Sequence, residues 1–188
     1  MQPTRKRITA GLKLITGVID ATNSMVGHVV AFLILPVLFF IMYEVVSRRF
    51  FNAPTIWAFE MIVMCFGAYV ILTPGYGLLR GSLVCIDLVS KKFNPKTSHL
   101  ILMLSYLLFF TPFVVCLLPA CYAYALQSWT GNEMSWSAWA PPIYPLKMTI
   151  PIGWSLLCLQ GLSEMLKSAL ALMNMGNGES IPIQSGAA

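Results

Sequence analysis

Four long stretches of this chain contain no Asp, Glu, Lys or Arg, and they limit its fold more than any other feature. They are residues 25–43, 61–79, 100–126 and 148–163. About 19 residues of helix rise roughly 28 Å, close to the hydrocarbon thickness of a bilayer. Only 10% of the chain is charged, compared with about 25% in a soluble domain. We therefore expect an all-α membrane protein with four transmembrane helices. The fourth run is short, but the Lys167 side chain can reach the interface, so the helix can continue over residues 168–173.

The expected organisation is a transmembrane domain over residues 25–173, between a cytoplasmic arm (1–24) and a flexible cytoplasmic tail (174–188). Its spans are expected at about 25–47, 56–80, 99–127 and 146–172. Within the arm, an apolar stripe typical of an amphipathic interfacial helix is formed by Ile8, Leu12, Ile15 and Ile19. A simple N-terminal extension of the first span fits the same residues equally well.

The lysines and arginines predict the orientation. Nine of the twelve fall on one side, in the N-terminal arm, around the second connection and toward the C-terminus: Arg5, Lys6, Arg7, Lys13, Arg80, Lys91, Lys92, Lys96 and Lys167. The positive-inside rule then places both termini in the cytoplasm. The net charge of +5 fits attraction to anionic headgroups and gives no reason to expect nucleic acid as a partner.

Turn and helix-breaking residues predict how the spans are connected and bent. Asn52, Ala53 and Pro54 predict a tight turn, so the first two spans form an antiparallel hairpin. Pro74 predicts a kink at the end of the second span, and the third run, which contains Pro112 and Pro119, is expected to be tilted and bent. The longest external segment, residues 127–147, is expected to place an aromatic belt at headgroup level: Trp129, Trp136, Trp139 and Tyr144.

The chain shows no pattern of catalytic, cofactor or metal-binding residues, so we do not expect an enzyme. The five cysteines form no CxxC pair, and most lie in apolar runs, where cysteine is usually a small hydrophobic residue. Ionisable residues near the spans are functional candidates by default, but all of them fall near span ends: His28, Glu44, Glu60, Asp87 and Glu164.

Two other functions remain open at this point. A small four-helix exporter would need Glu44 as its coupling acid, although Glu44 lies one turn from the outer end of its span, next to Arg48. A membrane b-type cytochrome would use His28 and His99 to ligate a haem, because both are expected near the cytoplasmic face.

The stretch YEVVSRRFFNAPTIWAFEM, residues 43–61, resembles the first hairpin of the small membrane (DctQ-like) subunit of tripartite ATP-independent periplasmic (TRAP) transporters. The family pattern is matched at Arg49, Phe51, Asn52, Trp57 and Glu60. Where the family has His-Val-Arg-Val-Asp, this chain has Leu83-Val84-Cys85-Ile86-Asp87, so two polar groups are replaced. Residues 144–164, YPLKMTIPIGWSLLCLQGLSE, are similar to the family's last span.

The resemblance implies a subunit whose chemistry belongs to its partners. Such a chain binds a large multi-span subunit that carries the sodium and substrate sites, and enlarges its static scaffold in the bacterial inner membrane. A periplasmic solute-binding protein delivers the solute, commonly an organic acid anion. No cofactor is implied. The candidate residues for contact with the partner subunit or with phospholipid are Arg48, Arg49, Asn52, Trp57, Glu60, Asp87, Lys91, Lys92, Trp136 and Trp139.

The two arginines of this stretch suggest how the first hairpin is fixed. Glu44 precedes Arg48 by four residues, the favourable order for an ion pair on a helix. Glu60 begins the returning helix, within reach of Arg49 across the turn. We hypothesise that Arg49 and Glu60 lock the hairpin, while Trp57 anchors it at the interface. Binding of both arginines to lipid phosphates is the alternative.

Overall fold

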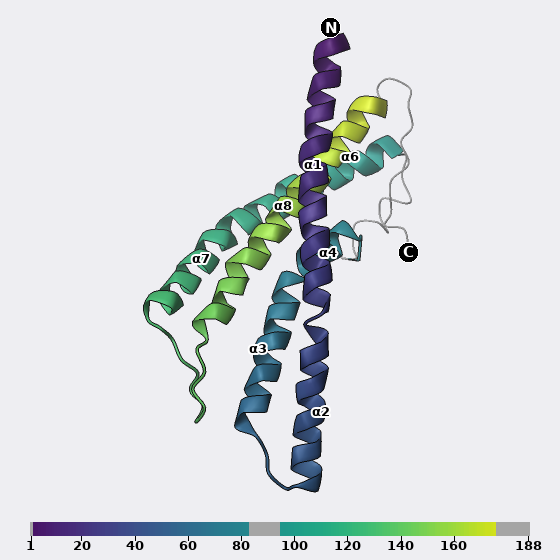
Figure 1. The fold of residues 1–188 in the computed structure, drawn as a ribbon. Helices are drawn as coiled ribbons and strands as arrows, with labels where there is room; N and C mark the ends of the chain where they lie inside the picture. Colours follow the sequence, from purple (N-terminus) through teal and green to yellow (C-terminus); the bar gives the residue numbers. More distant parts are fainter. Residues whose placement is uncertain (1, 83–94, 176–188) are drawn as a thin grey trace. The chain divides into compact units, whose positions relative to one another are not determined.

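The computed structural model describes residues 2–82 and 95–175. Within these residues the chain is helical, and the only extended pairing is one antiparallel bridge between Met134 and Pro142. The helices are α1 (Gln2–Ala31), α2 (Ile34–Phe50), α3 (Ile56–Leu72), α4 (Pro74–Leu79), α6 (Pro95–Ser105), the π-helix η1 (Tyr106–Phe110), α7 (Thr111–Thr130) and α8 (Tyr144–Met175) (Figure 1). The expected all-α class is therefore confirmed for the described residues.

Three segments of the described chain are long and apolar enough to cross a membrane. They are Thr9–Phe50, Ile56–Leu79 and His99–Thr130. The fourth expected span, residues 146–172, lies within the continuous helix α8, but α8 is not one of these three. Three spans are thus supported by length and composition, whereas four were expected.

The chain divides into two compact units. Unit 1 comprises Met1–Met25, Gly75–Cys116 and Leu156–Ala188, and unit 2 comprises Val26–Pro74 and Leu117–Ser155. Four helices, α1, α4, α7 and α8, contribute residues to both units.

Proline explains where the first long helical segment breaks. Pro36 has no N–H to donate to the Phe32 carbonyl, and its ring crowds that oxygen. The backbone there forms hydrogen bonds between residues three apart instead of four, from Leu33 N to Val30 O at 2.9 Å and from Leu35 N to Phe32 O at 3.1 Å. As a result α1 ends at Ala31 and α2 begins at Ile34, so the arm and the start of the first span lie on one helix.

The later prolines act in two different ways. Pro74 is the first residue of α4, and α3 ends just before it at Leu72, so the expected kink is confirmed as a helix break. Pro112 follows η1, in which the Thr111 N–H bonds to Tyr106 O across five residues. The π-turn lets the helix continue past proline, although proline has no backbone N–H to donate. Pro119 and Pro151 lie inside α7 and α8.

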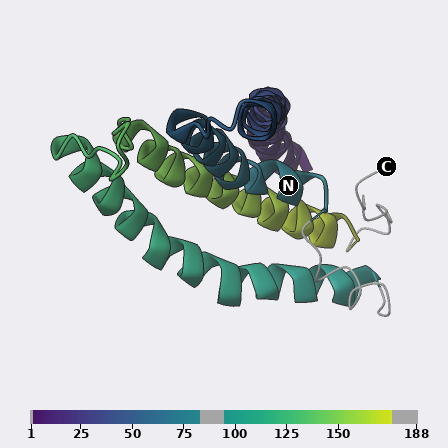
Figure 2. The ribbon, with the colours of Figure 1, turned by 90° about the horizontal axis from the view of Figure 1, so that it is seen from below.

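Unit 2 is built on the expected hairpin. In it, α2 and α3 lie side by side and are joined by residues 51–55 (Figure 1). Figure 2 shows the order α2, α3, α8, α7 across this unit. Glycine brings two of these helices together: a Cβ added at Gly153 of α8 would collide with the carbonyl of Ile71 in α3. On the other side of α8, Ser155 Oγ lies 3.3 Å from the Tyr122 hydroxyl of α7.

Burial is inverted relative to a water-soluble domain. Gln160 and Ser163 are 0% exposed and Asn23 is 2% exposed, whereas Phe109 is 71% exposed. A soluble domain buries its large apolar side chains and leaves few polar groups inside. Buried polar side chains under an apolar exterior are the arrangement that lipid favours, because polar groups in a bilayer must find partners within the protein.

Candidate functional site: a polar contact between α1 and α8

The largest set of polar side-chain contacts in the described chain joins α1 to α8 within unit 1. On α1 the polar residues recur every three or four positions, at Thr16, Asp20 and Asn23. On α8 the same spacing places Gln160, Ser163, Glu164 and Lys167 on one face. Residues at this spacing share one side of a helix. The sequence of each helix thus produces a polar stripe.

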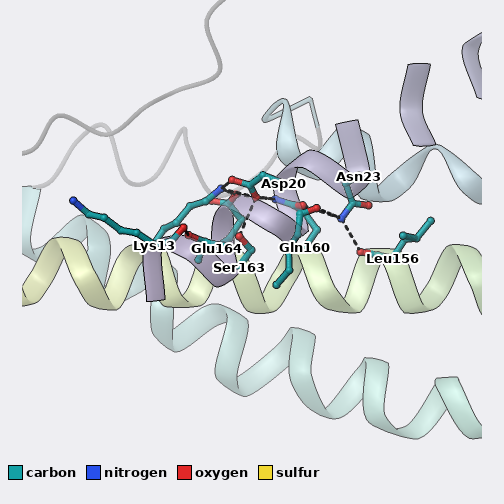
Figure 3. Close-up of polar contacts among 10 residues, drawn as sticks. Lys13, Asp20, Asn23, Leu156, Gln160, Ser163 and Glu164 are labelled. Carbon is teal, nitrogen blue, oxygen red and sulfur yellow. Dashed lines mark hydrogen bonds and ion pairs between the residues drawn. The ribbon is translucent and has the colours of Figure 1, made fainter. Parts of the chain in front are cut away.

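Asp20 is the centre of the contact. Its Oδ1 accepts hydrogen bonds from Gln160 Nε2 at 2.9 Å, Ser163 Oγ at 2.9 Å and Lys167 Nζ at 3.1 Å. Lys167 Nζ also lies 2.8 Å from Asp20 Oδ2 and 2.7 Å from Glu164 Oε1. Figure 3 shows Asp20, Gln160 and Ser163 converging between the two helices. One ammonium group is therefore shared by two carboxylates.

Asn23 extends the contact by one helical turn. Its Nδ2 donates to Gln160 Oε1 at 3.0 Å, with longer bonds to the backbone oxygens of Leu156 at 3.4 Å and Ile19 at 3.3 Å. Gly75 of α4 packs onto Asn23 so closely that an added Cβ would collide with Asn23 Oδ1. This point joins α1, α4 and α8.

The contacts of this cluster indicate a structural role. The positions that a cation would take between Asp20 and Glu164 are filled by Lys167 Nζ. In the described ranges there is no group of three or more His, Cys, Asp or Glu side chains that could hold a metal ion. Interhelical hydrogen bonds in membranes contribute about 0.6 kcal/mol on average, and several of them act together here. The cluster thus fixes α8 against the N-terminal helix.

Sequence reasoning did not identify this site. Lys167 was expected to reach the interface, and its ammonium is bound between two carboxylates that were not expected as partners. Glu164 was considered only as an isolated ionisable residue, and Asp20 was not considered. The signal was nevertheless present, because both helices carry polar residues at matching three- and four-residue spacing.

The first hairpin of unit 2 is fixed by Glu44, which is 8% exposed. Its Oε1 accepts from Arg48 Nη2 at 2.7 Å and Nε at 3.2 Å, so the predicted ion pair is confirmed. Its Oε2 accepts from the Thr55 backbone N–H at 3.1 Å and from the Thr55 hydroxyl. Thr55 immediately precedes α3. The carboxylate therefore connects the end of α2 to the start of α3.

The hypothesised Arg49–Glu60 lock is wrong. Among the described residues, Arg49 forms no ion pair with Glu60, and its side chain is exposed. Glu60 Oε1 instead accepts a hydrogen bond from Ser135 Oγ at 2.7 Å. The physical reason is that Ser135, which is distant in sequence, reaches Glu60 from the connection between α7 and α8. Glu44 and Thr55 make the link that was assigned to Arg49 and Glu60.

The remaining predicted residues fall into four groups. Trp57 packs on α2, with ring centroids 5.1 Å from Tyr43 and 6.1 Å from Phe40. Asn52 adopts a left-handed backbone conformation, φ 49°, in the predicted turn. Trp136 and Trp139 are exposed on the connection between α7 and α8. Asp87, Lys91 and Lys92 lie outside the described residues.

That connection is attached to α8 by an ion pair, in which Lys147 Nζ lies 2.6 Å from Glu133 Oε2. Lys147 also lies 4.3 Å from the centroid of the Tyr124 ring of α7. The Lys147 ammonium holds the pKa of the Glu133 carboxyl below its ordinary value. A depression of about 430 Å³ adjoins the pair, lined by Tyr124, Gln127, Ser128, Gly131, Glu133 and Lys147.

The two histidines of the cytochrome alternative belong to different units. His99 in α6 is 7% exposed, and neither of its ring nitrogens has a hydrogen-bond partner in the described chain. His28 lies near the end of α1, in unit 2.

Comparison with known proteins identifies the family. Residues 37–171 match the family model of the DctQ component of tripartite ATP-independent periplasmic transporters. The chain belongs to the DctQ family. The matched region includes the Glu44 hairpin, the connection between α7 and α8, and the α8 side of the polar contact, whereas Asp20 and Asn23 precede it. No curated protein and no solved structure matches the chain.

Membership gives the general role. A DctQ protein is the small membrane component of a TRAP transporter, and such components function with a large membrane component and a periplasmic binding protein. The apolar helices of the described chain are consistent with a membrane component.

Proposed function

We propose that this chain is the static scaffold subunit of a sodium-coupled TRAP transporter that takes up an organic acid. The large subunit would carry the substrate and sodium sites, and this chain, which catalyses no reaction, would support it in the bacterial inner membrane. The family match over residues 37–171 is the observation that carries this proposal. The proposed topology has four spans, with both termini in the cytoplasm.

Three acidic residues of the described chain, Asp20, Glu44 and Glu164, support a scaffold rather than a coupling role. Both oxygens of Glu44 already accept hydrogen bonds from Arg48 and Thr55. Asp20 and Glu164 share the Lys167 ammonium. A carboxylate that must take up and release an ion cannot be permanently satisfied by fixed partners. Glu44 is therefore a poor coupling acid for the exporter alternative.

Co-purification is the first test of the scaffold role. A tagged chain extracted from native membranes should retain a large multi-span partner, since a scaffold has no function apart from the moving subunit. Glu44→Gln and Glu164→Gln should change the yield of that complex or leave solute uptake nearly intact. The matched control is Lys13→Gln, which changes one exposed charge. Solute transport by this chain alone in liposomes would contradict the proposal, as would a variant that abolishes uptake while complex yield and solute binding stay normal.

A further inference from the structure

One end of unit 2 exposes large apolar side chains on its connections. Phe50 is 78% exposed and Phe51 75% exposed at the end of α2, while Met134 is 53% and Trp136 99% exposed between α7 and α8. Fully burying a side chain of this size is favourable by about 1.5–3 kcal/mol. We call these four residues and Trp139 the aromatic rim. A rim that stays exposed to water does not gain this free energy of burial.

The connection that carries Trp136 has a fixed shape. Ser135 N donates to Pro141 O at 2.8 Å, and Ile143 N donates to Glu133 O at 2.9 Å. Inside this loop, Ser137 Oγ accepts from Trp139 N at 3.2 Å and Ala140 N at 3.1 Å. Trp136 therefore projects from a hydrogen-bonded turn, and little further order has to be imposed on the backbone when the side chain is buried.

The two connections of the rim lie at the same end of unit 2 (Figure 1). Ser135 of one is hydrogen-bonded to Glu60, just after the other, at 2.7 Å. A shallow depression of about 390 Å³ lies between them, lined by Pro54, Thr55, Ile56, Trp57, Ala138 and Trp139. The two connections of the rim are thus joined at this end of unit 2.

The charges around the rim indicate what covers it. Residues 134–146 contain no Asp, Glu, Lys or Arg. Glu133 is paired with Lys147 and Glu44 with Arg48, whereas the half-buried Glu60 accepts a hydrogen bond from Ser135. Arg49 is exposed and has no ion-pair partner among the described residues. Exposed indole rings and an exposed guanidinium at the same end of unit 2 match the phospholipid headgroup zone, where aromatic rings are enriched and arginine meets phosphate.

We infer that the aromatic rim docks into the phospholipid headgroup zone, with Trp136 inserted among the lipids and Arg49 facing lipid phosphate. The α2–α3 hairpin and the α7–α8 connection are then anchored in the same leaflet through one surface. The inference needs a membrane-spanning chain but not the scaffold role, so either can fail alone.

Fluorescence quenching by brominated lipid tests the docking. The full-length chain is placed in phosphatidylcholine nanodiscs whose lipids are brominated near either the carbonyl or the methyl end of the acyl chains. The emission of Trp136 is the difference between wild type and Trp136→Phe, a substitution at a side chain that is 99% exposed and so leaves the fold intact. Lipids brominated near the carbonyl end should quench this difference more strongly than those brominated near the methyl end. Aqueous iodide should quench it less than in the denatured chain.

Two outcomes would overturn the inference. Trp136 emission that iodide quenches fully, and bromine at neither depth reduces, would place the rim in water. If bromine does not quench the emission, but iodide quenches it less when the chain is in its native complex, the rim contacts a protein partner instead. Trp129→Phe is the matched control, since Trp129 packs on Tyr144 with ring centroids 4.9 Å apart. Its difference signal should depend less on the position of the bromine.

Discussion

At the scale of single residues, the Lys167 ammonium forms ion pairs with two carboxylates, Asp20 and Glu164. Asp20→Asn removes the acid that also accepts from Gln160 and Ser163. We expect it to lower the free energy of unfolding by about 1–3 kcal/mol, the cost of leaving partly buried polar groups without a partner. The measurement is thermal unfolding in detergent. Lys13→Gln, on the same helix, is the control and should change stability by less than about 0.5 kcal/mol.

The pairing itself is tested by a double-mutant cycle. Asp20→Asn together with Lys167→Met should cost less stability than the sum of the two single variants, because both substitutions remove the same Asp20–Lys167 contact. Strictly additive losses would show that the two side chains act separately, and the shared ion pair would then be refuted.

How well residue-scale contacts could be predicted depended on their distance along the chain. The Glu44–Arg48 pair follows from four-residue spacing on a helix, and it forms at 2.7 Å. Glu60 instead bonds to Ser135, a residue 75 positions away, which no local spacing can indicate. Arg49 therefore does not pair with Glu60, the partner expected across the turn. Predicting such contacts requires the packing of the helices first.

At the scale of elements, proline positions indicate most of the helix breaks. Pro74 predicted the interruption between α3 and α4, and Pro36 marks the break between α1 and α2 by the same physics. Pro112 has a different outcome, a π-turn that keeps the helix continuous. Pro119 and Pro151 are accommodated inside helices. The residue type therefore indicates where strain arises, and neighbouring contacts decide whether the helix ends.

Helix packing at this scale depends on glycine where α3 and α8 meet. A Cβ at Gly153 would collide with the Ile71 carbonyl, which belongs to backbone and cannot rotate away. Gly153→Ala should therefore cost about 1–3 kcal/mol, as overpacking does. The control is Gly17→Ala, where nothing lies within 4 Å of the added Cβ, and where alanine should be neutral or stabilising by up to about 1 kcal/mol. Equal melting temperatures for the two variants would contradict the close approach.

At the scale of the whole molecule, the number of spans was hardest to predict from hydropathy. Gln160, Glu164 and Lys167 make α8 less apolar by composition, and α8 is not among the three candidate spans. Gln160 and Ser163, however, are completely buried, with α1 supplying their partners. Hydropathy counts these groups as if they met the surroundings of the helix, although they meet protein. A helix whose polar side chains are hydrogen-bonded within the protein can therefore span more of the membrane than its hydropathy indicates.

The last prediction follows from this reasoning and concerns the orientation of the two ends of α8. If α8 crosses the bilayer, the connection at residues 131–143 and the C-terminus lie on opposite sides. In a background without native cysteines, Ala138→Cys should react with an impermeant maleimide added to intact spheroplasts. Gly11→Cys, at a position with open space around its Cβ, should react only after permeabilisation. A C-terminal fusion to green fluorescent protein should then fluoresce, and one to alkaline phosphatase should be inactive. The reverse pattern at the C-terminus, with Ala138→Cys still external, would mean that α8 does not cross and that the protein has three spans.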